Sequence, residues 1–158
     1  QDVFDERTSQ ILRSVKVPVG ILIEKDLGKA EDIFIPIFSE KDHFLLQLAQ
    51  KIVRTESVNI IILDPFGYIE MHSEIKDTIL EIGTIAPGRV VLHNEKALEK
   101  DFMQKQDLMI IGLDSWKQAV ESHSLWLSYS PSVLIVNAPH AANFPASADM
   151  SILEAAKI

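Results

Sequence analysis

The segment 107–115 constrains the fold of this 158-residue chain more than any other part of it. Its sequence is DLMIIGLDS, in which four consecutive apolar residues stand between Asp107 and Gly112. A short apolar run of this kind is typical of a strand buried on both faces, as in parallel sheets that helices cover on either side. In such sheets ligands bind beyond the carboxyl ends of the strands. The loop after Gly112 therefore decides whether the chain has a nucleotide site, and this loop is not glycine-rich.

Strand and helix patterns alternate along the rest of the chain. Apolar runs predict five strands, at 32–38, 58–63, 89–93, 108–111 and 133–136. Helical periodicity predicts the intervening helices, at 44–55, 71–82, 97–102 and 115–127. Alternation with short connections is typical of right-handed β-α-β units. We therefore expect an α/β fold, with a doubly wound, mainly parallel five-stranded sheet of order 3-2-1-4-5 and helices on both faces.

Two further segments flank this unit. A helical pattern at 5–15 and a strand at 17–23 precede it, and a tail from residue 140 follows it. The tail holds a predicted short helix at 149–157, whose apolar residues we expect to dock on the body: Ile152, Leu153 and Ala156. Because the chain begins at Gln1 and enters structure almost at once, we interpret it as a piece of a longer protein.

Segment 18–23 repeats the pattern of segment 131–136. Two interpretations stay open: strands of this kind look alike, or residues 1–24 are the last helix and strand of a preceding copy. The second divides the chain into the tail of a preceding half at 1–24, an α/β domain at 25–139 and a C-terminal tail at 140–158.

Composition excludes several classes of function. Lys and Arg number 15 against 23 Asp and Glu, a net charge of −8, which argues against nucleic acid and anionic membrane as partners. No apolar run approaches the roughly 20 residues that span a bilayer, so we expect no membrane insertion of this part. The chain has no cysteine and its five histidines lack ligand spacing, so we expect no metal site.

The predicted strand order places the switch point between the first and fourth strands, where ligands bind in such folds. The candidate ligand-binding residues follow strands of this sheet: Ser39, Lys41, Asp64, Gly112, Asp114 and Ser115. Polar residues at strand ends also serve turns and helix caps, and we favour that interpretation. Ser39 has capping-box spacing with Asp42, and such caps occupy N–H groups that a phosphate needs. Ser115 has the same spacing with Gln118, and Asn94 is the expected N-cap of the helix after the third strand.

Four segments carry a resemblance to a known family: 17–23 (VPVGILI), 33–42 (IFIPIFSEKD), 107–112 (DLMIIG) and 130–136 (SPSVLIV). Their order resembles the universal stress protein domain. It resembles more closely the junction between tandem stress-protein-like halves in the cytoplasmic C-terminal region of bacterial monovalent cation:proton antiporters of the second family. The resemblance implies a non-catalytic regulatory and assembly domain on the cytoplasmic side of the inner membrane. Its implied partner is the transmembrane transport domain of the same protein, and a homodimer is a further expectation. In stress proteins the fifth strand pairs antiparallel with its twofold mate, so the resemblance also implies that the extra strand at 18–23 pairs with segment 131–136 and protects its edge.

The resemblance also implies a degenerate nucleotide pocket. In ATP-binding stress proteins the pattern is an Asp in the first strand, then Gly-x-x-Gly and a later Gly-Ser or Gly-Thr after the fourth strand. Here only Gly112 matches, because Ser115 replaces the second glycine and segment 35–37 (IPI) fills the first strand. We therefore expect no ATP or other cofactor and, without a Walker or Gly-x-Ser-x-Gly loop, no enzymatic activity. The alternative is a nucleotide- or small-ligand-binding stress sensor that uses the same rim.

Two further expectations concern large side chains. Met71, Met103 and Met109 stand at positions typical of a core. Trp116 and Trp126 both fall on the helix predicted at 115–127. Ten residues of helix separate them, so they do not face the same way. One of them is therefore expected either at an interface or partly buried in the core.

Overall fold

The computed structural model describes residues 20–23, 30–93 and 98–138. Three predictions lie outside the described residues: the helix at 5–15, the N-cap Asn94 and the helix at 149–157. The domain limits at 24–25 and 139–140 also fall on residues that the structure does not describe, so the division into domains stays a prediction.

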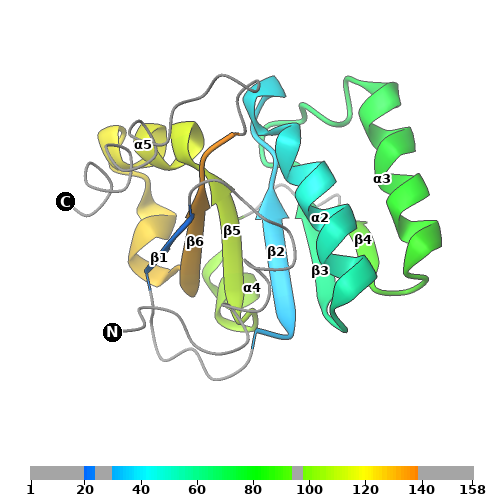
Figure 1. Ribbon diagram of the computed structural model, residues 1–158. Coiled ribbons are helices and arrows are strands. Elements are labelled where there is room, and N and C mark those ends of the chain that lie inside the picture. Colours follow the sequence, from blue (N-terminus) through cyan, green and yellow to red (C-terminus); the bar gives the residue numbers. More distant parts are fainter. Residues whose placement is uncertain (1–19, 24–29, 94–97, 139–158) are drawn as a thin grey trace, which may run out of the picture.

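Five parallel strands form the body of the sheet: β2 (Asp32–Pro36), β3 (Asn59–Leu63), β4 (Val90–His93), β5 (Leu108–Gly112) and β6 (Ser132–Val136). Their order across the sheet is β4-β3-β2-β5-β6 (Figure 1). This arrangement confirms the predicted α/β class and the predicted order 3-2-1-4-5. The two strands that the chain visits first and fourth, β2 and β5, are neighbours, so the switch point lies between them.

An extra strand, β1 (Gly20–Ile23), extends the sheet beyond β6. It runs antiparallel to β6, with Gly20 opposite Val136 and Ile23 opposite Val133. The predicted antiparallel partner of the fifth strand is therefore confirmed. Because β1 hydrogen-bonds along one side of β6, this strand does not present an open edge.

Helices lie on both faces of the sheet, as expected. The 3-10 turn η1 (Glu40–Asp42), α2 (Phe44–Thr55) and α3 (Ser73–Ile85) follow β2 and β3, and α2 and α3 cover one face (Figure 1). The opposite face carries α4 (Lys100–Gln104), α5 (Leu113–Glu121) and the 3-10 helix η2 (Leu125–Tyr129). This distribution of helices follows from right-handed crossovers. From β2 to β4 the chain adds strands in one direction across the sheet. It then returns to add β5 on the other side of β2, so the later helices lie on the opposite face.

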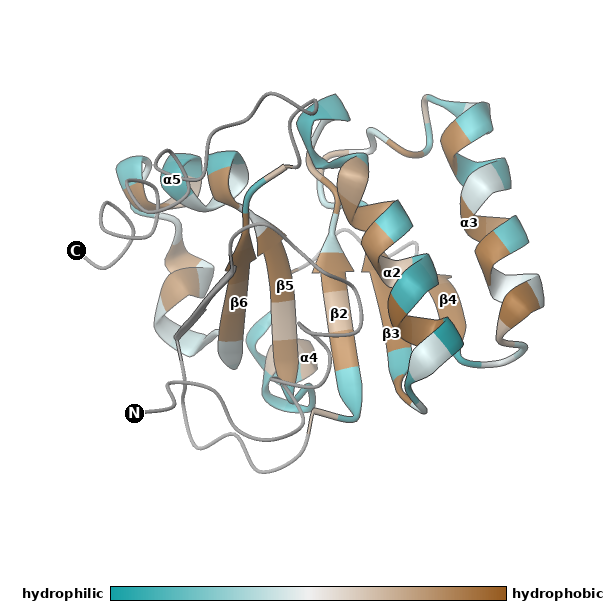
Figure 2. Ribbon diagram, in the orientation of Figure 1, coloured by the Kyte–Doolittle hydropathy of each residue, from teal (hydrophilic) through white to brown (hydrophobic). Residues whose placement is uncertain are grey.

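The sheet separates two apolar clusters, and the alternation of side chains along β2 supplies both of them. Ile33 and Ile35 pack in the cluster under α2 and α3, whereas Phe34 packs in the cluster on the other face. All three side chains are fully buried. Apolar residues line the strands between the helix layers (Figure 2), as a sheet covered on both faces requires.

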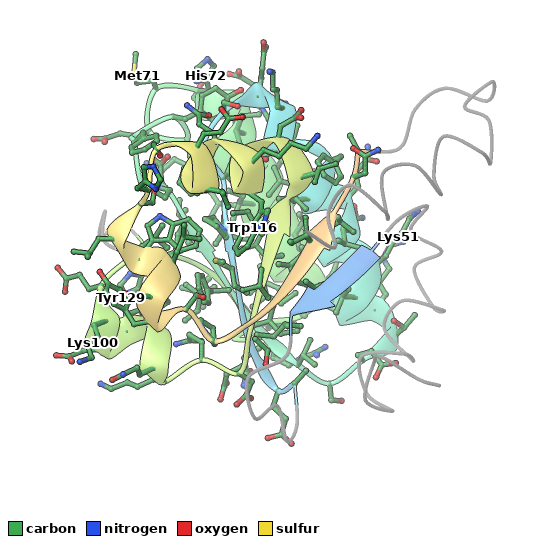
Figure 3. The ribbon with its side chains drawn as sticks, turned by 90° about the vertical axis from the view of Figure 1, so that its left-hand side faces the viewer. Lys51, Met71, His72, Lys100, Trp116 and Tyr129 are labelled. Atoms are coloured by element: carbon green, nitrogen blue, oxygen red, sulfur yellow. The ribbon has the colours of Figure 1, made fainter. Side chains whose placement is uncertain are left out.

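The methionine prediction is correct for Met103 and Met109, which are fully buried, and wrong for Met71, whose side chain is 80% exposed. The helix expected from residue 71 begins only at Ser73. Met71 belongs to the preceding turn, where its N–H donates to the Gly67 carbonyl. Its side chain therefore points away from the body (Figure 3).

The helix predicted at 115–127 is two shorter elements. α5 ends at Glu121, and His123 takes a left-handed conformation with φ 54° before η2 begins. Trp116 and Trp126 therefore lie on different elements, and their rings meet edge to face with centroids 6.3 Å apart. Both are partly buried against the second apolar cluster, so the expectation of one helix carrying two divergent tryptophans is wrong.

Candidate functional site

A buried carboxylate occupies the switch point between β2 and β5. Asp42, at the end of η1, is only 1% exposed. Its Oδ2 accepts a hydrogen bond from the Phe38 N–H at 2.9 Å. The Ser115 hydroxyl, from α5, donates to both oxygens, at 3.0 Å to Oδ1 and 2.8 Å to Oδ2. One side chain thus ties the loop after β2 to the helix after β5.

Gly112 makes room for this carboxylate. The residue ends β5 and is the N-cap of α5, with an ordinary φ of −70°. A Cβ atom at this position would lie 2.6 Å from Asp42 Oδ1, much closer than such atoms approach. Glycine therefore serves here to leave space for the carboxylate, which a larger residue would displace, rather than to allow an unusual backbone conformation. Its absent side chain lets a negative group lie beside the N-terminus of a helix, which is electrostatically favourable.

The site shifts the protonation equilibrium of Asp42. Burial raises the pKa of its carboxyl above the ordinary value of 3.8 and outweighs the opposing hydrogen bonds from Phe38, Ser115 and Ser39. The nearby Asp114 carboxylate raises the pKa further. The hydrogen bonds therefore compensate only part of the unfavourable free energy of placing a charge in a dry site.

The structure brings two of the predicted site residues, Gly112 and Ser115, into direct contact with the Asp42 carboxylate. Ser39 lies beside it and caps η1, because its Oγ accepts the Lys41 N–H at 3.3 Å. Lys41 and Asp114 are exposed at the rim. The predicted pairing of Ser115 with Gln118 is wrong. Ser115 is the third residue of α5, and Gly112 is the N-cap.

Asp64, the remaining candidate, organises a different loop. It is buried, and its two oxygens accept the N–H groups of Ile69 at 2.8 Å and of Glu70 at 2.9 Å. Both acceptors therefore stabilise the turn that leads from β3 toward α3. This geometry is the turn chemistry that we favoured for polar residues at strand ends.

Sequence reasoning missed Asp42 as the centre of the site and treated it only as a capping residue. The carboxylate and Ser115 are 73 positions apart, so no local spacing links them. The usable signal was Gly112, an isolated glycine at the end of a buried strand, which indicates close approach of another group. The identity of that group becomes apparent only when the loops after β2 and β5 are placed side by side.

A second polar cluster surrounds Tyr68, in the loop after β3. Its hydroxyl hydrogen-bonds to Nε2 of His43, and the His72 ring lies against it with centroids 4.3 Å apart. Burial raises the pKa of the Tyr68 hydroxyl, and the carboxylates of Glu40 and Glu74 add to the effect. The Tyr68 hydroxyl therefore keeps its proton at neutral pH. Within the described ranges, no group of three or more His, Asp or Glu side chains is placed to hold a metal ion.

Comparisons of the chain with protein-family models, with curated proteins and with solved structures found no match. Among the helices that the structure describes, none has both the length and the apolar character needed to cross a bilayer. The function must therefore be argued from the switch point itself and from the resemblance in sequence pattern.

Proposed function

We propose that this chain is a non-catalytic regulatory and assembly domain of a sodium- or potassium:proton antiporter, on the cytoplasmic side of the inner membrane. The assignment to an antiporter has its support in the sequence resemblance of segments 17–23 and 33–42. On this proposal, ion transport is carried out by the transmembrane domain of the same protein, which is the partner of this domain.

The observation that carries the non-catalytic, nucleotide-free part of the proposal is the Asp42 carboxylate beside Gly112. In a doubly wound sheet, phosphates bind where backbone N–H groups at a helix N-terminus converge on the switch point. Here the chain supplies its own anion to that place. Two unit charges 4 Å apart near a protein surface repel by about 4 kcal/mol. That free energy corresponds to a loss of roughly a thousandfold in phosphate affinity.

The pairing of β1 with β6 supports the assembly role. A segment that precedes the domain in sequence completes the sheet at the side where an edge would otherwise be open. Such pairing is the geometry expected if residues 1–24 continue a preceding stress-protein-like half. The two halves would then form a pseudo-dimer within one chain.

A thermal-shift titration tests the nucleotide part of the proposal. With ATP, ADP, AMP and cyclic dinucleotides at millimolar concentration, we expect no change in the unfolding temperature. Ligand at a hundredfold excess over its Kd would stabilise the fold by about 2.7 kcal/mol, which is a rise of several degrees for a chain of this size. A saturable rise would overturn the proposal in favour of a nucleotide or small-ligand sensor.

Transport measurements test the antiporter part. The parent gene should encode about a dozen upstream hydrophobic spans of roughly 20 residues each. Deletion of this domain from the full-length protein should change cation-dependent proton flux in membrane vesicles without abolishing it. Complete loss of flux from correctly inserted protein would assign the domain a part in transport itself, and unchanged flux would remove its regulatory role.

A further inference from the structure

A hollow lies beside the switch point, between the loops after β2 and β3 and the helices α5 and η2. It consists of two adjoining parts, of about 310 Å³ and about 90 Å³. Four residues line both parts: Phe38, Phe66, Ser124 and Trp126. We call this hollow the aromatic groove. Trp116 lies beneath α5 and Tyr129 lies on the neighbouring η2 (Figure 3).

The walls of the aromatic groove are aromatic and its lining is uncharged. Phe38 and Phe66 form one wall, with ring centroids 5.4 Å apart. Leu125, Trp126 and Tyr129 of η2 form the other. No lining residue of either part is Asp, Glu, Lys or Arg. Burying a charge in such a place is unfavourable, so the aromatic groove favours apolar side chains as its occupant.

Two apolar side chains stand open to solvent at the rim of the aromatic groove. Phe66 is 75% exposed and Leu125 is 76% exposed. Both line the larger part of the hollow, Phe66 from the loop after β3 and Leu125 from η2. Large apolar side chains that flank one hollow are typical of a surface that a further segment covers.

The chain itself leads from the sheet toward this surface. β2, β3 and β6 are parallel, so their carboxyl ends lie at one edge of the sheet. Phe38 and Phe66 follow β2 and β3 by two and three residues, and the described part of the chain ends at Ala138, two residues beyond β6. The last described residue therefore leaves from the edge at which the aromatic groove opens.

Segment 139–158, which follows the last described residue, has the length and the composition needed to fill the aromatic groove. Segment 139–158 contains twenty residues, of which three are charged. At about 3.3 Å per extended residue it reaches roughly 66 Å, several times the radius of gyration of about 15 Å expected for a domain of this size. Its apolar residues include Phe144, Ile152 and Leu153. A tethered segment also acts at an effective concentration in the millimolar range, which an unlinked partner must exceed to compete.

We propose that segment 139–158 binds in the aromatic groove of its own chain, with Ile152 and Leu153 packed between Phe66 and Leu125. The tail then covers both exposed rim residues and excludes other occupants from the hollow beside Ser115. This interaction does not depend on the antiporter assignment, since it uses only the groove and the tail.

Disulfide trapping in the full-length chain tests the contact directly. The chain has no cysteine of its own, so a pair introduced by Leu125→Cys and Leu153→Cys is the only pair available. Under mild oxidation we expect a cross-link within one chain, seen as faster migration on a non-reducing gel and as a linked peptide pair by mass spectrometry. The matched control combines Leu153→Cys with Leu80→Cys. Leu80 is also exposed, at 63%, but lies on α3, away from the aromatic groove.

A fluorescence measurement keeps the test independent of cross-linking. The only two tryptophans of the chain lie on the walls of the groove or against them. Ile152→Asp combined with Leu153→Asp should raise the acrylamide quenching constant at least 1.5-fold. Leu125→Asp should give the same rise, and adding it to the tail variant should give no further increase. Leu80→Asp should give none.

Three outcomes would overturn the proposal. Equal cross-linking of Leu153→Cys with Leu125→Cys and with Leu80→Cys would mean that the tail has no fixed place. Additive quenching effects of the tail and groove variants would put the tail elsewhere on the molecule. Cross-links only between chains, with a tail-dependent dimer in sedimentation, would make the occupant the tail of a second copy.

Discussion

At the scale of single residues, the switch point is built on one buried charge. Asp42 is held by the Phe38 N–H and the Ser115 hydroxyl, and the glycine at position 112 leaves space for it. The carboxylate lies at the switch point, the place where ligands bind in doubly wound sheets. It also lies beside the N-terminus of α5, where a negative charge is electrostatically favourable.

Replacement of Asp42 by Asn should change how stability depends on pH. Because burial raises the pKa of Asp42 above 3.8, the folded protein binds this proton more tightly than the unfolded chain. The contribution of this group to stability is therefore largest at low pH and falls as pH rises through the raised pKa. The free energy of unfolding of the wild type, relative to Asp42→Asn, should increase as pH is lowered from 7 to 4 in urea titrations.

The control for this pH series is Asp77→Asn, which removes an exposed carboxylate on α3. The difference in free energy of unfolding between the wild type and Asp77→Asn should not increase as the pH is lowered from 7 to 4. A difference between wild type and Asp42→Asn that stays constant with pH, or decreases toward pH 4, would contradict the raised pKa.

Substitution of Gly112 by Ala should destabilise the fold because the added Cβ would lie 2.6 Å from Asp42 Oδ1. Overpacking of this kind typically costs about 1 to 3 kcal/mol. The urea midpoint should fall accordingly. Gly83→Ala is the matched control. Its Cβ would meet the Val90 carbonyl oxygen at an ordinary 3.5 Å, and Ala is preferred over Gly inside a helix. An equal decrease of the urea midpoint in Gly112→Ala and Gly83→Ala would argue against a tight contact at Gly112.

Among the helices, the C-terminal end of α2 depends on the side chain of Arg89, which lies between α3 and β4. The Arg89 guanidinium donates to the carbonyl oxygens of Glu56 at 2.9 Å, Val53 at 3.2 Å and Val58 at 3.4 Å. Its positive charge is also favourable beside the last carbonyls of a helix. One residue that precedes β4 thereby joins α2, the loop after it and the sheet.

Arg89→Met should therefore lower the free energy of unfolding by about 2 kcal/mol, the scale of hydrogen bonds made by a charged group. The free energy of unfolding of Arg89→Lys should lie between those of the wild type and of Arg89→Met. The lysine ammonium keeps the positive charge but lacks the planar set of N–H donors of a guanidinium. Chemical denaturation of the three proteins measures both differences. A lysine variant as stable as the wild type would mean that charge alone, and not the set of three hydrogen bonds, matters here.

At the scale of the whole molecule, the sheet has two unlike sides. β6 is hydrogen-bonded to β5 on one side and to β1 on the other, whereas the described partner of β4 is β3 alone. The amides of a strand that is hydrogen-bonded on both sides are protected from hydrogen exchange like those of an interior strand. The N-terminal segment of the chain thus changes the character of a strand that lies more than a hundred residues later.

Native-state hydrogen exchange should show this difference. Amides of Val133 to Val136 should exchange as slowly as those of β2 and β5, because the β1 pairing covers them, and amides of β4 should exchange faster. Exchange of β6 at the rate of β4 would indicate that β1 is not paired in solution. A protein lacking the segment before residue 25 is the direct comparison, and its β6 amides should lose protection.

Local patterns in the sequence are enough to predict the class of fold. Apolar runs and helical periodicity are local properties, and short right-handed connections leave few ways to order parallel strands. They were sufficient for the strands and for a parallel, doubly wound sheet of order 3-2-1-4-5, whereas the antiparallel partner of β6 was implied by the resemblance to the stress-protein family. These patterns were less reliable at the ends of elements. They wrongly placed Met71 in a helix and did not predict the break at His123. At these positions one turn residue decides whether a helix begins or continues.

The chemistry of the switch point and of the surface beside it depends on contacts between residues far apart in the chain. Ser115 has the spacing of a helix cap, yet its hydroxyl is directed to a carboxylate 73 positions earlier in the chain. Trp116 and Trp126 pack together because the chain reverses between them. Both contacts depend on which loops the sheet places side by side. The physical reason is that local patterns encode which faces are buried, whereas a site is made by residues that approach one another only after the strands have paired.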